Sequence, residues 1–163
     1  MKKYDKQNQK LLAIWAADCA KRVLPFFEKE YPKDDRPRKA IKVCRAWIRT
    51  GVFKMADIRG ASLAAHTSAR VAKGNNAACF AARAAGQAVA TAHVPQHAFG
   101  SAYYALKAVA ASDPVNAMAK IAKERNWQLR HLPQNLRQEI LNKILTKKRK
   151  NEIFIKIQKG KDF

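Results

Sequence analysis

Apolar residues recur every three or four positions along most of this chain, which is the spacing of one face of an α-helix. The first such series consists of Leu12, Trp15, Ala16, Cys19 and Val23. It predicts an amphipathic helix over residues 5–24, which Pro25 kinks or ends because proline lacks an amide hydrogen. A second helix is expected between Asp35, a capping carboxylate followed closely by Pro37, and Gly51, a typical helix stop.

Five further helices follow from the same pattern. The third is expected over residues 55–73 and the fourth over about 76–93, after which Pro95 kinks the fourth or opens a fifth ending near residue 111. Asp113 and Pro114 begin a sixth helix that runs to about residue 130. Pro133 begins a seventh, whose apolar stripe is Leu136, Ile140, Leu141, Ile144 and Leu145. These elements predict an all-α fold of about seven helices, packed as an antiparallel bundle or a short right-handed superhelix.

The C-terminal residues follow a different pattern. Residues 1–146 are expected to form a single helical domain, and residues 147–163 a basic C-terminal tail that opens with a basic run at 147–150. Ile153, Ile155 and Ile157 alternate with other side chains, which favours a strand, whereas Phe154 and Ile157 could continue a helical stripe. The pattern leaves strand and helix open for residues 152–158.

Composition narrows the class of protein. A chain of 163 residues with 48% hydrophobic residues fits one folded domain, so the net charge of +21 does not signal disorder. No apolar run approaches the ~20 residues that span a bilayer, and we expect a cytoplasmic protein with no membrane partner. Cys19, Cys44 and Cys79 lie far apart and form no CxxC pair, so we expect them to be buried thiols in a reducing compartment.

Charge is placed unevenly along the chain. Residues 61–112 contain four basic residues and no carboxylate, whereas the two flanking segments hold the other 29 basic residues and all 12 acidic ones. Of the 30 alanines, 23 lie between residues 61 and 122. Because alanine favours helices and allows them to approach closely, the middle of the chain predicts the core helices.

Three of the four histidines lie in this carboxylate-free segment. His93 and His97 have the HxxxH spacing that presents two imidazoles to a zinc ion when the helix is continuous, and His66 could join them in space. Pro95 interrupts the pair, and no nearby carboxylate could serve as a further ligand or base. Hydrogen-bonded interior histidines are therefore favoured over a metal site or a catalytic histidine, and no metal or other cofactor is expected.

Arg70 and Arg83 lie among apolar neighbours, where a guanidinium needs a partner. Asp18 or Asp57 could supply an ion pair from another helix, or the two arginines could form an anion pocket with a protonated histidine. The glycine-rich phosphate loops, nucleophile elbow and zinc-protease motif are absent from the sequence. We therefore do not expect an enzyme.

A basic stripe runs along the second expected helix. It consists of Arg38, Lys42, Arg45 and Arg49. Such a stripe could track phosphates, which together with a pI of about 10.3 makes weak nucleic-acid binding an alternative to an ordinary solvated face.

Several segments carry a family resemblance. Residues 81–98, AARAAGQAVATAHVPQHA, resemble the central signature of a bacterial putative immunity protein family, the five-like immunity proteins of polymorphic toxin systems. Residues 64–70 and 103–109 resemble the adjoining parts of that signature, and residues 15–20, 34–38 and 127–133 look like its flanking motifs. The resemblance covers about residues 5–140.

The resemblance implies an all-helical protein that binds and neutralises a cognate toxin protein. A basic nucleic-acid-associated protein is the alternative, and a metal-dependent enzyme using the histidines is the third possibility. The candidate binding residues are His66, Arg70, Arg83, His93, His97, Tyr103, Tyr104, Trp127 and His131. The sequence gives neither the identity of the toxin nor the oligomeric state.

Overall fold

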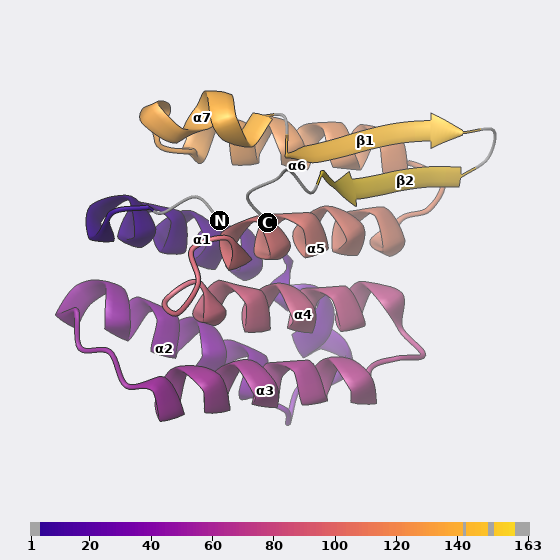
Figure 1. Cartoon of the computed structure of the whole chain (residues 1–163). Coiled ribbons are helices and arrows are strands. Elements are labelled where there is room, and N and C mark those ends of the chain that lie inside the picture. The colour runs from indigo at the N-terminus through magenta and orange to yellow at the C-terminus, as the bar shows by residue number, and fades with distance from the viewer. Residues whose placement is uncertain (1–3, 142, 150–151, 159–163) are drawn as a thin grey trace.

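A computed structural model describes residues 4–141, 143–149 and 152–158 of the chain. Within these residues it contains seven helices and one β-hairpin, which confirms the all-α class (Figure 1). The elements are α1 (Lys6–Glu30), α2 (Arg36–Thr50), α3 (Met55–Val71), α4 (Asn76–Ala90), α5 (His97–Ser112), α6 (Ala117–His131), α7 (Gln134–Leu141), β1 (Ile144–Arg149) and β2 (Glu152–Ile157).

The alanine-rich helix α4 lies at the centre of the bundle. It packs against α1, α2, α3 and α5, and the consecutive helices α3, α4 and α5 run antiparallel (Figure 1). Nine residues of α4 are buried; six of them are alanines, and the other three are Cys79, Gly86 and Val89. Small side chains let four neighbours approach one helix closely, so the expectation that the middle of the chain forms the core is confirmed.

The bounds of the first two helices confirm part of the sequence prediction and correct the rest. α1 continues through Pro25 to Glu30 and does not end at Leu24. Pro25 and Lys21 are both exposed, so water can satisfy the carbonyl that loses its hydrogen bond. Gly51 ends α2 with a φ of 70°, as predicted. The expected cap by Asp35 is wrong, because Asp34 Oδ1 instead accepts a hydrogen bond from the Arg36 amide at 3.2 Å.

Three other helix boundaries differ from the sequence expectation. α3 ends at Val71 and α4 ends at Ala90, and the connection over residues 91–96 leads to a separate α5 that begins at His97. The HxxxH spacing therefore does not lie on one helix. α6 begins at Ala117, because Asp113 Oδ1 accepts from the Asn116 amide and holds the preceding residues in a turn.

The seventh helix, α7, is shorter than predicted, because a β-hairpin follows it. Ile144 and Leu145 belong to β1 rather than to a helical stripe, and Ile144 pairs with Ile157 in an antiparallel register. Ile144 is buried, and Ile153 and Ile155 of β2 pack against the core, so the alternation of isoleucines signals a strand. The side chains of Ile140 and Leu141, residue 150 of the basic run and residues 159–163 lie outside the described part. The boundary placed at residue 146 falls inside β1.

The three cysteines are buried and free, as expected. Burial raises the pKa of the Cys44 thiol to about 12, and Cys44 Sγ lies 3.3 Å from the Ala88 carbonyl oxygen that accepts its hydrogen. None of the described helices combines the length and the apolar character that crossing a bilayer requires.

Candidate binding pocket between α3, α4 and α5

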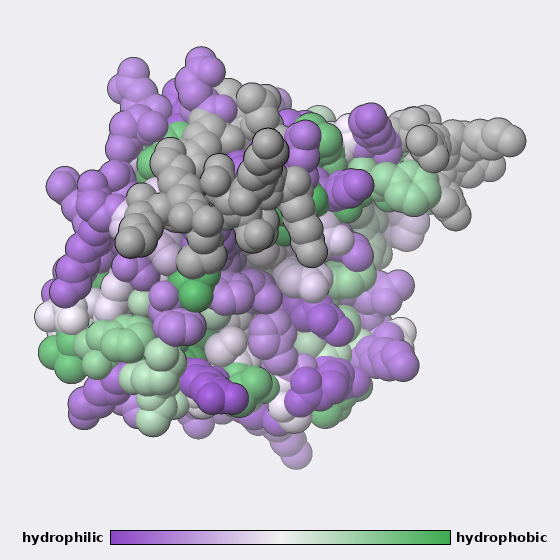
Figure 2. All heavy atoms as spheres, viewed as in Figure 1, coloured by the Kyte–Doolittle hydropathy of each residue, from purple (hydrophilic) through white to green (hydrophobic). Residues whose placement is uncertain are grey.

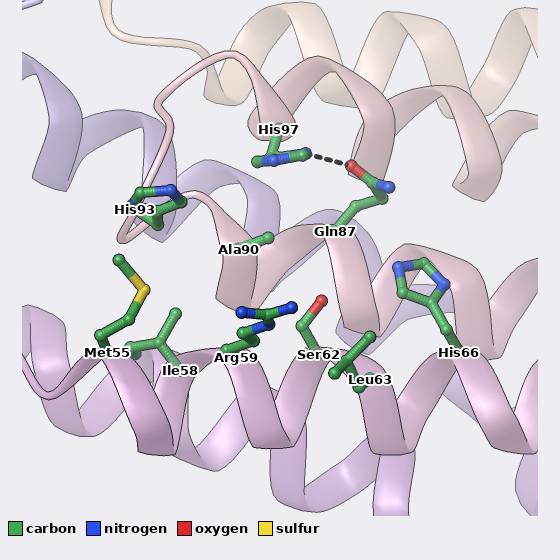
Figure 3. Close-up of a pocket in the computed structure, with 10 residues that line it drawn as sticks. All are labelled: Met55, Ile58, Arg59, Ser62, Leu63, His66, Gln87, Ala90, His93 and His97. Carbon is green, nitrogen blue, oxygen red and sulfur yellow. Dashed lines mark hydrogen bonds between the residues drawn. The ribbon is translucent and has the colours of Figure 1, made fainter.

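A pocket of about 340 Å³ opens between α3, the end of α4 and the start of α5 (Figure 3). Its wall contains three of the four histidines, one arginine and several apolar side chains. The lining residues are Met55, Ile58, Arg59, Ser62, Leu63, His66, Gln87, Ala90, His93 and His97. The three histidines that the sequence singled out thus line one pocket.

The α3 wall is set by helical spacing. Arg59, Ser62 and His66 follow each other at intervals of three and four residues, so their side chains rise from one face of α3 toward α4 (Figure 3). Ser62 Oγ donates a hydrogen bond to the Gly86 carbonyl at 3.0 Å and ties the two helices together. Ile58, which is buried, anchors the same face in the core.

Two glycines allow the polar side chains to pack against helix backbones. A Cβ at Gly86 would lie 2.9 Å from His66 Nε2, and a Cβ at Gly100 would lie 2.6 Å from Gln87 Oε1. Both contacts are shorter than a real Cβ tolerates, so the absent side chains leave room for the His66 ring and the Gln87 amide.

The α4–α5 connection places the other two histidines. Gln9 Nε2 of α1 donates to the carbonyls of Thr91 and Ala92 at 3.0 Å each, and these hydrogen bonds hold the connection against α1. His97 Nδ1 donates to Gln87 Oε1 at 2.7 Å, since an amide oxygen can only accept. The His93 ring stacks on Phe53 with centroids 6.5 Å apart.

The pocket is electropositive because its lining contains one arginine, Arg59, and no acidic residue. No lining residue is a carboxylate, and within the described residues Arg59 forms no salt bridge. Burial lowers the pKa of His66, and the nearby Arg83, Arg70 and His97 lower it further. Burial also lowers the pKa of His97, with a contribution from His93. An anion in the pocket would reverse these electrostatic effects.

Exposed apolar side chains lie along one side of the pocket. Met55 and Leu63 line it, Phe53 stacks on His93, and Val52 directly precedes Phe53 in the chain. These four residues, here called the apolar rim, are 43%, 53%, 43% and 61% exposed, respectively. Figure 2 shows apolar side chains gathered where Figure 1 places the connection from α2 to α3. Scattered exposed apolar residues are ordinary, whereas a group of them beside a polar pocket is a candidate binding surface.

Arg70 and Arg83 lie close to the pocket but outside its lining. Their expected ion pairs with Asp18 or Asp57 do not form within the described residues, because Asp18 pairs with Arg45 at 2.7 Å. Arg70 donates to Thr67 Oγ1 at 2.7 Å. The Arg83 guanidinium lies 5.7 Å from the Tyr104 ring centroid, and hydrogen bonding to the Cys79 side chain raises its pKa.

The remaining candidate residues lie in two other places. Tyr103 and Tyr104 form an edge-to-face pair on α5, near Phe80 and Lys107. Trp127 and His131 stack on α6 with centroids 4.1 Å apart, and the Arg22 guanidinium lies 4.1 Å from the Trp127 ring. The structure therefore does not join these four residues to the histidine pocket.

The basic stripe on α2 is partly neutralised. Arg38 pairs with Glu28 at 2.6 Å and Arg45 with Asp18, both carboxylates of α1. Lys42 and Arg49 are exposed, and no carboxylate pairs with either in the described part of the chain. A continuous run of four free cations along α2 is thus replaced by alternating paired and unpaired ones.

Sequence reasoning missed Arg59, Gln87 and the apolar rim. Arg59 lies two helical turns before His66, and this i, i+7 relation was a usable signal once His66 was suspected. Consecutive apolar residues at 52 and 53, directly after the helix stop at Gly51, were a second signal. The described residues contain no group of three or more His, Cys, Asp or Glu side chains that could hold a metal ion.

A comparison with protein-family models assigns the chain to a family. The description "Imm-5 like putative immunity protein" belongs to the family model that matches residues 2–135. The chain is a member of this family. The match covers α1 to α6 and the pocket, while the hairpin over residues 144–157 follows the matched region. Searches of curated proteins and of solved structures gave no match.

Proposed function

We propose that this member of the Imm-5 like family is an immunity protein that binds a cognate toxin domain in the bacterial cytoplasm and neutralises it. Membership in an immunity family supports the general role. The observation that supports this binding surface is the electropositive pocket with the exposed apolar rim beside it. Such a surface combines a specific polar centre with apolar area that a partner can bury.

The composition of the pocket favours binding over catalysis. General acid–base chemistry commonly uses a carboxylate, or a histidine that a neighbouring carboxylate orients. The pocket wall has no carboxylate, and the His97 ring donates its hydrogen bond to a neutral amide oxygen, that of Gln87. The partner is therefore held and blocked rather than converted.

Co-expression with the products of neighbouring genes tests this function. We expect one product to be toxic alone, to be tolerated when this protein is present, and to co-purify with it. Leu63→Asp, which places a charge in the apolar rim, is expected to abolish both protection and co-purification. If no neighbouring product binds and none is neutralised, the proposal is wrong.

Val71→Asp is the matched control for Leu63→Asp. Both residues are exposed apolar positions on α3, at 59% and 53% exposure, but Val71 lies outside the pocket lining. We expect Val71→Asp to retain protection. Equal loss in the two variants would show that the rim is not the contact surface.

A further inference from the structure

The pocket holds positive charge that no acidic side chain of its lining compensates. Arg59 is its permanent cation, and its guanidinium extends from α3 into the space below α4 (Figure 3). The imidazoles of His66, His93 and His97 surround the same space. A group of this kind is complementary to an anion.

We propose that the pocket binds the carboxylate of an acidic side chain on a partner protein, with Arg59 supplying the charge and the His66 and His97 rings supplying hydrogen bonds. The choice of a protein as the source of this carboxylate rests on the proposed function. The preference for a carboxylate rests on the pocket alone.

The number of permanent charges favours a monoanion. Arg59 is the one arginine or lysine among the lining residues, while Arg70 is engaged with Thr67 and Arg83 faces Tyr104. A carboxylate matches one guanidinium, whereas a phosphate ester with close to two negative charges is typically bound by more donors. The apolar rim suits the apolar neighbours of an acidic residue in a protein loop better than it suits a sugar–phosphate backbone.

Binding is expected to be coupled to proton uptake. His97 Nδ1 is committed to Gln87, so Nε2 can donate to a carboxylate only when the ring carries a second proton. The charged and titratable groups around the two rings are Arg59 and Arg70 on α3, Arg83 on α4, and His93 in the connection. All of them are cationic or neutral, so they disfavour that proton until an anion arrives. Affinity for the carboxylate therefore increases as the pH falls.

Nuclear magnetic resonance titration of the full chain tests the proposal without a toxin. The probe is N-acetyl-aspartate N-methylamide, and its uncharged asparagine analogue is the control ligand. We expect the aspartate probe to shift the His66 and His97 ring signals with saturation, more tightly near pH 6 than near pH 8. Arg59→Gln is expected to weaken binding about tenfold, as loss of a charge-assisted hydrogen bond implies, and Lys123→Gln on exposed α6 surface to leave it unchanged.

Three results would overturn the carboxylate assignment. These are equal binding of the asparagine analogue, equal weakening by Arg59→Gln and Lys123→Gln, and binding of inorganic phosphate in place of the aspartate probe. None of them depends on finding a toxin. Conversely, a pocket that binds the probe in a protein that protects against no neighbouring product would support the site and reject the immunity function.

Discussion

Arginine side chains have two different environments in this molecule. Four arginines of α1 and α2 pair with carboxylates, among them Arg22, 2.9 Å from Glu124, and Arg45, 2.7 Å from Asp18. In the pocket, Arg59 has no carboxylate among the lining residues and forms no salt bridge with any described residue. The first environment stabilises the fold, and the second leaves charge available to a partner.

This difference follows from where the acids lie in the chain. All 12 acidic residues belong to the two flanking segments, so α4 and α5 offer the pocket no counter-charge. The net charge of +21 therefore describes the whole chain but does not locate its function. What distinguishes the pocket is unpaired charge beside exposed apolar side chains.

The largest expected effect follows from removing an arginine that is paired with a carboxylate. Arg22→Met leaves the Glu124 carboxylate, in a residue only 4% exposed, without its partner and removes the guanidinium from the Trp127 ring. We expect the free energy of unfolding to fall by about 2 kcal/mol, because a buried carboxylate loses its charged hydrogen-bond donor while the Arg22 side chain itself is 37% exposed. Urea denaturation of the wild-type and variant chains measures this loss.

Arg59→Met is the matched substitution on the pocket side. Since Arg59 has no carboxylate partner in the described structure, we expect its removal to change the free energy of unfolding by less than about 0.5 kcal/mol. Similar losses in Arg22→Met and Arg59→Met would remove the distinction between the two environments.

The second effect concerns the glycines that admit polar side chains to the pocket. Gly86→Ala forces the His66 ring away from α4, and Gly100→Ala forces the Gln87 amide away from α5. We expect each to reduce the free energy of unfolding by about 1 kcal/mol despite the better helix propensity of alanine, and to shift the His66 or His97 ring signals.

Gly60→Ala separates this packing effect from propensity. A Cβ at Gly60, in the middle of α3, meets no atom within 4 Å. We expect it to stabilise the protein by about 0.5–1 kcal/mol. A similar gain in Gly86→Ala would mean that His66 does not need the close approach to α4.

The helices could be predicted from the sequence because their signals are local. Apolar spacing predicted α1 to α5, and Gly51 ended α2 where expected. The hairpin was not predicted in the same way: Ile144 was assigned to the stripe of the seventh helix, and strand and helix stayed open for residues 152–158. Its conformation depends on Ile157, thirteen residues later, and spacing within one segment does not reveal such a partner.

The candidate site could be predicted only in part. Residue type singled out His66, His93 and His97, and all three line the pocket. The ion-pair partners of Arg70 and Arg83 were wrong, because the packing of α1 against α2 brings Asp18 to Arg45 instead. Arg59 and Leu63 resemble any exposed helix residues in sequence, and only the three-dimensional arrangement groups them with the histidines.

The third prediction uses pH to test the burial of the histidines. Burial lowers the pKa of His66 and His97 below the value of histidine in the unfolded chain. Above that value both states are neutral and the two rings contribute nothing to the pH dependence. As the pH falls below it, the unfolded chain binds protons that the folded chain does not, so stability decreases until the folded pKa is reached.

Urea denaturation between about pH 8 and pH 5 measures this dependence. The His66→Gln variant should lose less stability over that interval than the wild-type chain, because one of the two depressed groups is gone. An unchanged slope in His66→Gln would show that the His66 ring is solvated in the native protein.

The smallest expected effect is on the pKa of His66, and it measures how much the neighbouring arginines contribute to the electrostatic potential in the pocket. Arg70 is exposed and contributes less to the lowered pKa of His66 than burial and Arg83 do, so Arg70→Gln should raise the His66 pKa only slightly. Titration of the His66 ring signal in the wild-type and variant chains measures the change. High salt screens charges that water can reach, so ~1 M salt should raise the wild-type pKa in the same direction and reduce the difference between the two chains. A His66 pKa that neither the substitution nor salt moves would mean that burial alone sets it. The unpaired arginines would then not create the positive potential that separates this pocket from the paired side of the molecule.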